Sequence, residues 1–157
     1  MNKNLRIAAL CVGLSLVAGC TTVRDARPPI EYFPEAAPGA AYSAAVRVGD
    51  VLYLTGQIGT RPDGSVPESV QEQTRLTLEN MSAELKSRGS GLDDVFKCTV
   101  MLTDISTWAD FNKVYVTFFK PGRLPARNAF GVNGLALKEL KVELVCLAHS
   151  PASRKAS

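Results

Sequence analysis

The fold is decided by the stretch Lys141-Val142-Glu143-Leu144-Val145-Cys146-Leu147-Ala148, which carries apolar side chains at most positions. Successive side chains of a β-strand point to opposite faces of its sheet. One face of this strand consists of Val142, Leu144, Cys146 and Ala148, and the other consists of Glu143, Val145 and Leu147. A single layer of helices covers only one face, so we expect the second face to bind another copy of the chain.

Four earlier segments also have the pattern of strands. Ranges 44–48 and 51–58 flank the turn Gly49-Asp50, which predicts a hairpin. A third strand is expected over 96–102 and a fourth over 127–132. In the third strand the residues expected to face the helices are Phe96, Cys98, Val100 and Leu102.

Two segments have helical spacing. Ser69 and Glu72 form a capping box ahead of apolar residues that recur every three or four positions, and Gly89 ends that helix. The second helix is expected over 107–119. Its buried side chains would be Trp108, Phe111, Tyr115 and Phe118. The order ββαβαββ predicts an α+β domain in which two helices pack on one face of a mixed sheet.

The N-terminus has the pattern of an export signal. Lys3 and Arg6 precede an apolar run over 7–18, and Val17-Ala18-Gly19-Cys20 resembles the bacterial lipobox. Residues 1–19 are therefore expected to be a lipoprotein signal peptide, with Cys20 lipidated and anchored to a membrane. Thr21 in place of an aspartate favours the periplasmic face of the outer membrane. An ordinary secretory peptide or an uncleaved anchor is the alternative.

The rest of the chain divides into three parts. Residues 20–37, rich in proline, alanine and charge, are expected to be a tether, 38–149 the folded domain, and 150–157 a flexible tail. Cys98 and Cys146 are the two cysteines inside the domain. An oxidising compartment would permit a disulfide between them, but their apolar neighbours favour two reduced core residues.

Composition argues against several classes of function. Without Lys3 and Arg6 the chain has 16 basic and 15 acidic residues, which gives no broad positive surface for nucleic acid. The one histidine, His149, cannot supply a Ser-His-Asp relay or a multi-histidine metal site, so no metal is expected. A solvated residue at a strand end is the simpler interpretation of His149.

Arg127 and Glu143 are the candidate functional side chains. Arg127 follows Pro125-Ala126 at the start of a strand, where a guanidinium could bind a carboxylate in a planar fork. Solvation or pairing with a nearby acid is the simpler interpretation. Glu143 shares an apolar strand face, where a carboxylate is costly unless it is paired or used. It could pair with Arg127 or Lys141, or it could orient water as a base.

The sequence resembles the RidA proteins, reactive intermediate deaminases formerly called the YjgF type, over about 38–149. The resemblance rests on five motifs in order: Pro38-Gly39-Ala40-Ala41-Tyr42-Ser43, Leu54-Thr55-Gly56-Gln57-Ile58, Phe111-Asn112-Lys113-Val114-Tyr115, Pro125-Ala126-Arg127 and Val142-Glu143. It implies a chorismate-mutase-like α+β fold, a homotrimer, and active sites in the clefts between subunits.

The resemblance also implies a reaction and its residues. Arg127 would bind the carboxylate of 2-aminoacrylate and related imines, and Glu143 would hold the attacking water. The backbone of Gly56 and Ala129 would contact substrate or water, and the remaining site residues would be Tyr42, Thr55 and Asn112. The product would be a 2-keto acid with ammonia, as for a 2-iminobutanoate/2-iminopropanoate deaminase, and no cofactor is required.

The chain departs from the family pattern at three positions. Asn128-Ala129 stands where many of these deaminases have Ser-Cys, and Val145 replaces a frequent second glutamate. The export signal also separates the protein from cytosolic sources of aminoacrylate. An envelope-anchored binding or chaperone-like trimer without turnover is therefore the alternative function. The ribonuclease activity sometimes attached to this family is disfavoured by the near-neutral charge.

Overall fold

The computed structural model of the chain describes residues 28–35 and 39–151. The predicted signal peptide, the lipidation site Cys20 and most of the predicted tail lie outside these residues. In the described part, no helix is long and apolar enough to cross a membrane.

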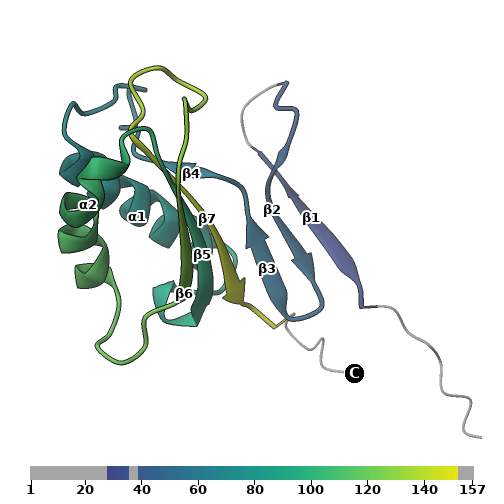
Figure 1. Ribbon diagram of the computed structural model, residues 1–157. Coiled ribbons are helices and arrows are strands. Elements are labelled where there is room, and N and C mark those ends of the chain that lie inside the picture. The colour runs from purple at the N-terminus through teal and green to yellow at the C-terminus, as the bar shows by residue number, and fades with distance from the viewer. Residues whose placement is uncertain (1–27, 36–38, 152–157) are drawn as a thin grey trace, which may run out of the picture.

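Two α-helices and seven strands make up the domain (Figure 1). The strands are β1 (Ile30–Pro34), β2 (Ser43–Val48), β3 (Val51–Leu54), β4 (Gln57–Ile58), β5 (Val95–Leu102), β6 (Ala126–Gly131) and β7 (Val142–His149). The helices are α1 (Val70–Ser87) and α2 (Trp108–Tyr115), with short 3-10 turns η1 (Leu92–Asp94), η2 (Ile105–Thr107) and η3 (Val116–Phe118). The predicted α+β class is confirmed.

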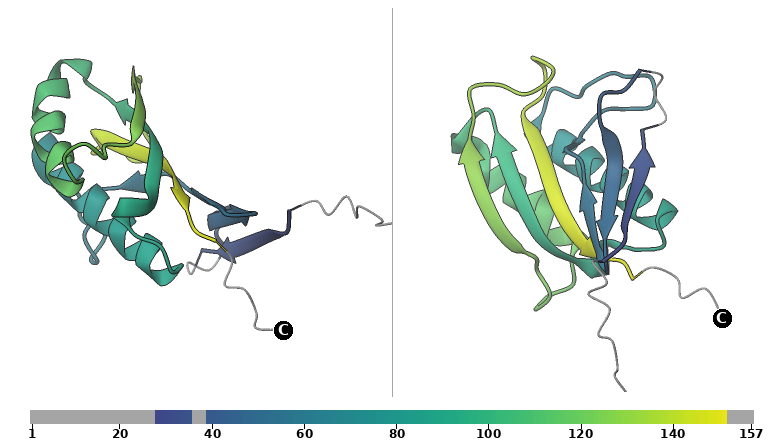
Figure 2. Two further views of the ribbon diagram at one scale, coloured as in Figure 1. Left: turned by 90° about the horizontal axis from the view of Figure 1, so that it is seen from below. Right: turned by 90° about the vertical axis from the view of Figure 1, so that its right-hand side faces the viewer.

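The strands form one mixed sheet in the order β1-β2-β3-β7-β5-β6, and β4 pairs with β7. Strands β5 and β6 are parallel and the other pairs are antiparallel. Both helices lie on the same side of the sheet, and the other face is left open (Figure 2). The core lies between helices and sheet, and its largest fully buried side chains include Tyr115, Phe111, Leu52, Leu78 and Met81.

Strand β1 extends the sheet beyond the predicted hairpin. Residues 30–34 fall in the segment assigned to the tether, yet they pair with β2 from Ile30 opposite Val48 to Pro34 opposite Ser43. Pro34 sits at the irregular end of this edge strand, where a missing backbone donor is tolerated. The sheet therefore begins before residue 38.

Two local predictions were wrong. Phe96 was expected to face the helices, but the register shifts between Val95 and Lys97, so Val95 is buried and Phe96 is 45% exposed. The predicted second strand is interrupted at Thr55 and Gly56, which separate β3 from β4. This interruption matters because Gly56 lies against Glu143, as described below.

Cys98 and Cys146 form a disulfide, so the expectation of two reduced thiols was wrong. The two residues are directly opposite each other on β5 and β7, and their Cα atoms are 4.2 Å apart. Alternation placed each of them in the core but could not reveal the cross-strand register. A bridge that closes a loop of 48 residues stabilises a domain by about 2–4 kcal/mol.

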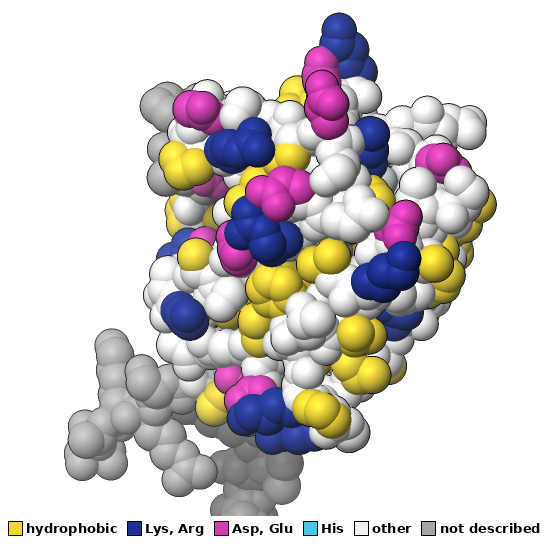
Figure 3. Space-filling model, turned by 90° about the vertical axis from the view of Figure 1, so that its left-hand side faces the viewer, with side chains coloured by type: hydrophobic (Ala, Val, Ile, Leu, Met, Phe, Trp, Pro, Cys, Tyr) yellow, Lys and Arg dark blue, Asp and Glu magenta, His cyan; other side chains and the backbone are white. Residues whose placement is uncertain are grey.

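The helical side of the molecule carries charges of both signs. Figure 3 shows basic and acidic side chains interspersed with apolar ones over this face. Several of them are paired along α1, where Arg75 bridges Glu72 and Glu79, and Arg88 pairs with Glu84. Ser69 caps α1 by accepting a hydrogen bond from the backbone N–H of Glu72, which confirms one half of the predicted capping box. The other half does not form, because the Glu72 carboxylate accepts from Arg75 instead.

Candidate active site

Arg127 lies on the helical side of β6, surrounded by aromatic rings. It is opposite Cys98 in the register of β5 and β6, and Cys98 is fully buried beneath the helices. Its guanidinium carbon is 4.4 Å from the ring centre of Trp108, 4.5 Å from that of Tyr115 and 5.6 Å from that of Phe111. All three rings come from α2 and pack against one another along it, Trp108 stacked on Phe111 and Phe111 tilted against Tyr115. The cation is therefore held by ring faces.

Three buried polar atoms of α2 and Arg127 make no hydrogen bond. Nη1 of Arg127, the hydroxyl of Tyr115 and Oδ1 of Asn112 are buried without a hydrogen-bond partner. Burial raises the pKa of Tyr115 to about 12, although the charge of Arg127 opposes this, and burial lowers the pKa of Arg127. Arginine keeps its charge even so. A buried polar group without a protein partner is explained by bound water, by strain or by a functional role.

A cavity of about 260 Å³ opens beside Arg127. Its lining comes from α2, η3, β6 and the segment that leads into β6, and consists of Trp108, Tyr115, Val116, Leu124, Pro125, Arg127, Asn128 and Ala129. Most of these side chains are apolar. The guanidinium is the one charged group in the lining, so the cavity suits an anion attached to an apolar group.

Glu143 lies on the other side of the sheet. It is opposite Met101 on β5, and it alternates with Val142 and Leu144, which are fully buried under the helices. Burial alone raises the pKa of its carboxyl group. A Cβ atom on Gly56 would be 1.9 Å from Oε1 of Glu143, so any larger residue at this position would displace the Glu143 carboxyl group.

A second cavity, of about 190 Å³, contains Glu143. Its lining consists of Tyr42, Thr55, Gly56, Ile58, Ala136 and Glu143. Four of these six residues are predicted site residues, and they come from three separate segments of the sequence. The carboxylate thus faces a small space whose other polar groups are hydroxyls and backbone, which is suitable for holding water.

Within one chain the predicted site residues form two separate groups. Tyr42, Thr55, Gly56 and Glu143 line the second cavity, and Arg127 and Ala129 line the first. Asn112 is on α2, next to Phe111 in the sequence, and it lines neither cavity. Glu143 does not pair with Arg127, because the two side chains leave opposite faces of the sheet.

Sequence analysis missed two side chains on α1 that fix the loops around Glu143. Gln73 is fully buried; its amide group donates to the carbonyls of Pro67 and Glu139 and accepts from the N–H of Lys141. Asn80 donates to the carbonyls of Ile58 and Thr60. Their signal was present in the sequence, because Gln73 occupies the apolar stripe of the helix, where a polar residue needs partners.

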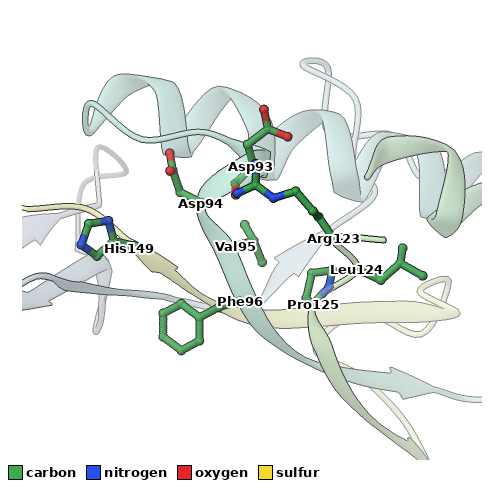
Figure 4. A pocket seen from close by; sticks show the side chains of 8 residues that line it. All are labelled: Asp93, Asp94, Val95, Phe96, Arg123, Leu124, Pro125 and His149. Carbon is green, nitrogen blue, oxygen red and sulfur yellow. The ribbon is translucent and has the colours of Figure 1, made fainter. Parts of the chain in front are cut away.

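A third hollow of about 390 Å³ lies at the start of β5 (Figure 4). It contains Asp93, Asp94, Arg123 and His149 but no predicted catalytic residue. Both of its carboxylates already have partners: Lys120 pairs with Asp93, and Asp94 accepts from the N–H of Gly91. This hollow is therefore a weaker candidate than the cavity at Arg127, with which it shares Leu124 and Pro125.

Comparisons with known proteins identify the family. The family model described as Endoribonuclease L-PSP matches residues 34–150. The rat protein named 2-iminobutanoate/2-iminopropanoate deaminase is 40% identical over 116 residues, which cover 71% of this chain and 83% of the rat protein. The mitochondrial protein mmf2 of Schizosaccharomyces pombe is 38% identical over 112 residues, 70% of this chain and 88% of that protein.

A solved structure gives the same result. RidA from an Antarctic Psychrobacter superposes with a TM-score of 0.67 at 33% identity, covering 76% of this chain and 97% of that one. The mixed sheet with two helices on one face matches the fold of this neighbour, and the sequence matches the family model over most of the chain. The chain therefore belongs to the RidA/YjgF family, whose family model is described as Endoribonuclease L-PSP.

Proposed function

We propose that the protein is a deaminase that hydrolyses carboxylate-bearing imines and enamines to 2-keto acids and ammonia. The observation that carries the proposal is the Arg127 guanidinium, which is the one charged group in the lining of an otherwise apolar cavity. A carboxylate in this cavity would accept from the guanidinium in a charge-assisted hydrogen bond. The rat relative, whose name states an imine deaminase activity, supports the same reaction.

The reaction needs a positioned water molecule and an electrophilic carbon. With the substrate carboxylate on Arg127, Glu143 accepts a proton from the water as its oxygen attacks the carbon of the protonated C=N bond. Protonated Glu143 then returns this proton to the nitrogen of the carbinolamine, and the C–N bond breaks to release ammonia. The hydroxyl group loses its proton to the released ammonia as the carbonyl forms. One protonated imine and one water thus give one keto acid and one ammonium ion. The 2-aminoacrylate enamine enters the same path after it tautomerises to its imine.

The separation of Arg127 from Glu143 within a chain leads us to propose a homotrimer with active sites between subunits. The open face of the sheet has a large apolar part beside the polar residues Lys97, Asn128 and Glu143. Its exposed aromatic side chains are Tyr32, Tyr53 and Phe130, which are 65%, 45% and 52% exposed, and they lie with Val46, Met101, Val145 and Leu147. Apolar area of this kind is stabilised by association. A neighbouring copy could then bring its own Arg127 to the cavity of Glu143.

For location we propose a lipid anchor at Cys20 in the cell envelope, on the periplasmic face of the outer membrane. The N-terminal sequence motif supports the anchor, and the Cys98–Cys146 disulfide supports an oxidising compartment. Mass spectrometry of the membrane fraction tests this. The expected N-terminal peptide begins at an acylated Cys20, and an intact Met1 peptide would contradict it.

Turnover is tested with imines formed in place by an amino acid oxidase. Purified protein should accelerate the release of ammonia and keto acid above the uncatalysed rate, and Arg127→Ala should lower kcat/KM by about 100-fold or more. Arg123→Ala, which removes an exposed arginine outside both cavities, is the matched control and should keep full activity. Imine binding without acceleration would replace the deaminase with a binding protein.

A further inference from the structure

The cavity beside Arg127 is larger than a small imino acid needs. Its volume is about 260 Å³, whereas the side chain of 2-iminopropanoate is a single methyl group. The walls come from Trp108, Val116, Leu124, Pro125 and Ala129, none of which carries a charge. A methyl group would leave most of these walls in contact with water or empty space, which contributes no binding.

The rim of the cavity is apolar as well. Val116 is 46% exposed and Leu124 is 52% exposed, and they line the cavity from the turn after α2 and from the segment before β6. Ala129 has a short side chain, and Pro125 is buried and fixes the backbone on the Leu124 side. The space between Val116 and Leu124 is therefore open and bounded by hydrocarbon.

The position of Arg127 fixes how a substrate enters this space. Its guanidinium lies over the rings of Trp108 and Tyr115 and lines the cavity on its other side, so a carboxylate reaches it from the cavity. In a 2-imino acid the carboxylate and the side chain are both attached to the carbon that carries the imine nitrogen. A carboxylate on Arg127 therefore places the side chain within reach of the adjoining apolar walls.

We propose that this cavity is a side-chain pocket and that the preferred substrates are 2-imino acids with a bulky apolar side chain, of leucine to phenylalanine size. This inference rests on the proposed deaminase function and adds the substrate class. Each additional buried methylene increases transition-state binding by about threefold to fourfold. A leucine-derived imine should therefore exceed an alanine-derived one in kcat/KM by about tenfold or more.

The test compares kcat/KM for imines generated by an amino acid oxidase from alanine, leucine and phenylalanine, each measured as keto acid released. Wild type should favour the leucine and phenylalanine imines. Val116→Trp, which fills the pocket from its rim, should reduce the leucine-to-alanine ratio to about one or below. Ile105→Trp is the matched control, since Ile105 is also β-branched, is 51% exposed and lines neither candidate cavity. It should leave the ratio unchanged.

The ratio is measured within one protein sample, so partial unfolding of a variant does not change it. A wild-type preference for the alanine imine, or equal rates for all three, would overturn the inference and leave the deaminase function intact. An unchanged ratio in Val116→Trp would overturn the assignment of this pocket. No acceleration with any imine would overturn the proposed function itself.

Discussion

Arg127 has an environment that its sequence context did not suggest. The sequence left two simple interpretations, solvation or an acidic neighbour, but the guanidinium instead lies against Trp108, Phe111 and Tyr115. Those rings were predicted only as buried positions of a helix. Their second role could not be inferred, because it depends on how closely β6 approaches α2.

Replacement of Arg127 by lysine tests whether shape matters in addition to charge. Lysine keeps the positive charge but cannot stack as a plane on Trp108 or form a bidentate fork. We expect Arg127→Lys to raise KM by about tenfold or more with a smaller change in kcat, since the carboxylate is bound in both ground and transition states. Steady-state kinetics measures this. A lysine variant with wild-type KM would show that charge alone suffices.

Ionisation of Glu143 should control how kcat/KM falls at acid pH. Burial raises the pKa of its carboxyl group above the ordinary 4.5, and only the ionised form accepts a proton from water. The acid limb of kcat/KM should therefore have a midpoint above pH 4.5, and Glu143→Gln should remove this limb along with most of the activity. A limb at or below pH 4.5 in wild type would contradict this assignment.

The carboxyl group of Glu143 should also make the folded protein less stable as the pH rises. Below pH 4.5 the carboxyl binds its proton in both the folded and the unfolded chain, so burial costs little. As pH rises through the raised pKa of the folded state, wild type loses stability relative to Glu143→Gln. The melting temperature of the variant should thus exceed that of wild type at pH 7, and the difference should vanish in acid.

At the scale of elements, periodicity predicted what depends on one segment at a time. The alternation in β7 and the helical spacing of α1 were sufficient, because each has a continuous buried face. The bulge at Phe96, the pairing of β1 and the Cys98–Cys146 bridge depend on register between strands. Sequence pattern in a single strand contains no information on register with its neighbour.

The buried side chain of Gln73 on α1 makes three hydrogen bonds to the backbone of two loops, at Pro67 and at Glu139 and Lys141. Gln73→Leu keeps the volume but leaves the N–H of Lys141 and two carbonyls without partners. We expect a loss of about 2–5 kcal/mol in the free energy of unfolding, measured by urea denaturation. Gln71→Leu, at an exposed position of the same helix, should change it by less than about 0.5 kcal/mol. Equal losses would contradict the role of Gln73.

At the scale of the whole molecule, one sheet face is covered by helices and the other is open (Figure 2). The sequence of β7 already predicted this imbalance, since both of its faces are largely apolar. The sequence could not show that Arg127 and Glu143 leave opposite faces, because that requires the order of β6, β5 and β7 in the sheet.

The open face can be tested by adding a charge to its apolar part. Val46→Asp places a carboxylate between Tyr32 and Tyr53, which lie opposite Val46 on the two neighbouring strands, where association would bury it at high cost. We expect light scattering to show monomers and assays to show at least about 100-fold lower activity, with the circular dichroism of a folded chain. Ala109→Asp, on the exposed surface of α2, should remain trimeric and active. A trimeric Val46→Asp protein would place the interface elsewhere.

The most direct test of a site shared between copies is complementation of two inactive variants. Arg127→Ala and Glu143→Gln are each expected to be inactive alone. After unfolding and refolding together in equal amounts, about a quarter of the sites in a random assembly would combine an intact Arg127 from one chain with an intact Glu143 from its neighbour. Imine hydrolysis should return to about that fraction of the wild-type rate. A mixture as inactive as its two components would show that the residues do not meet between copies.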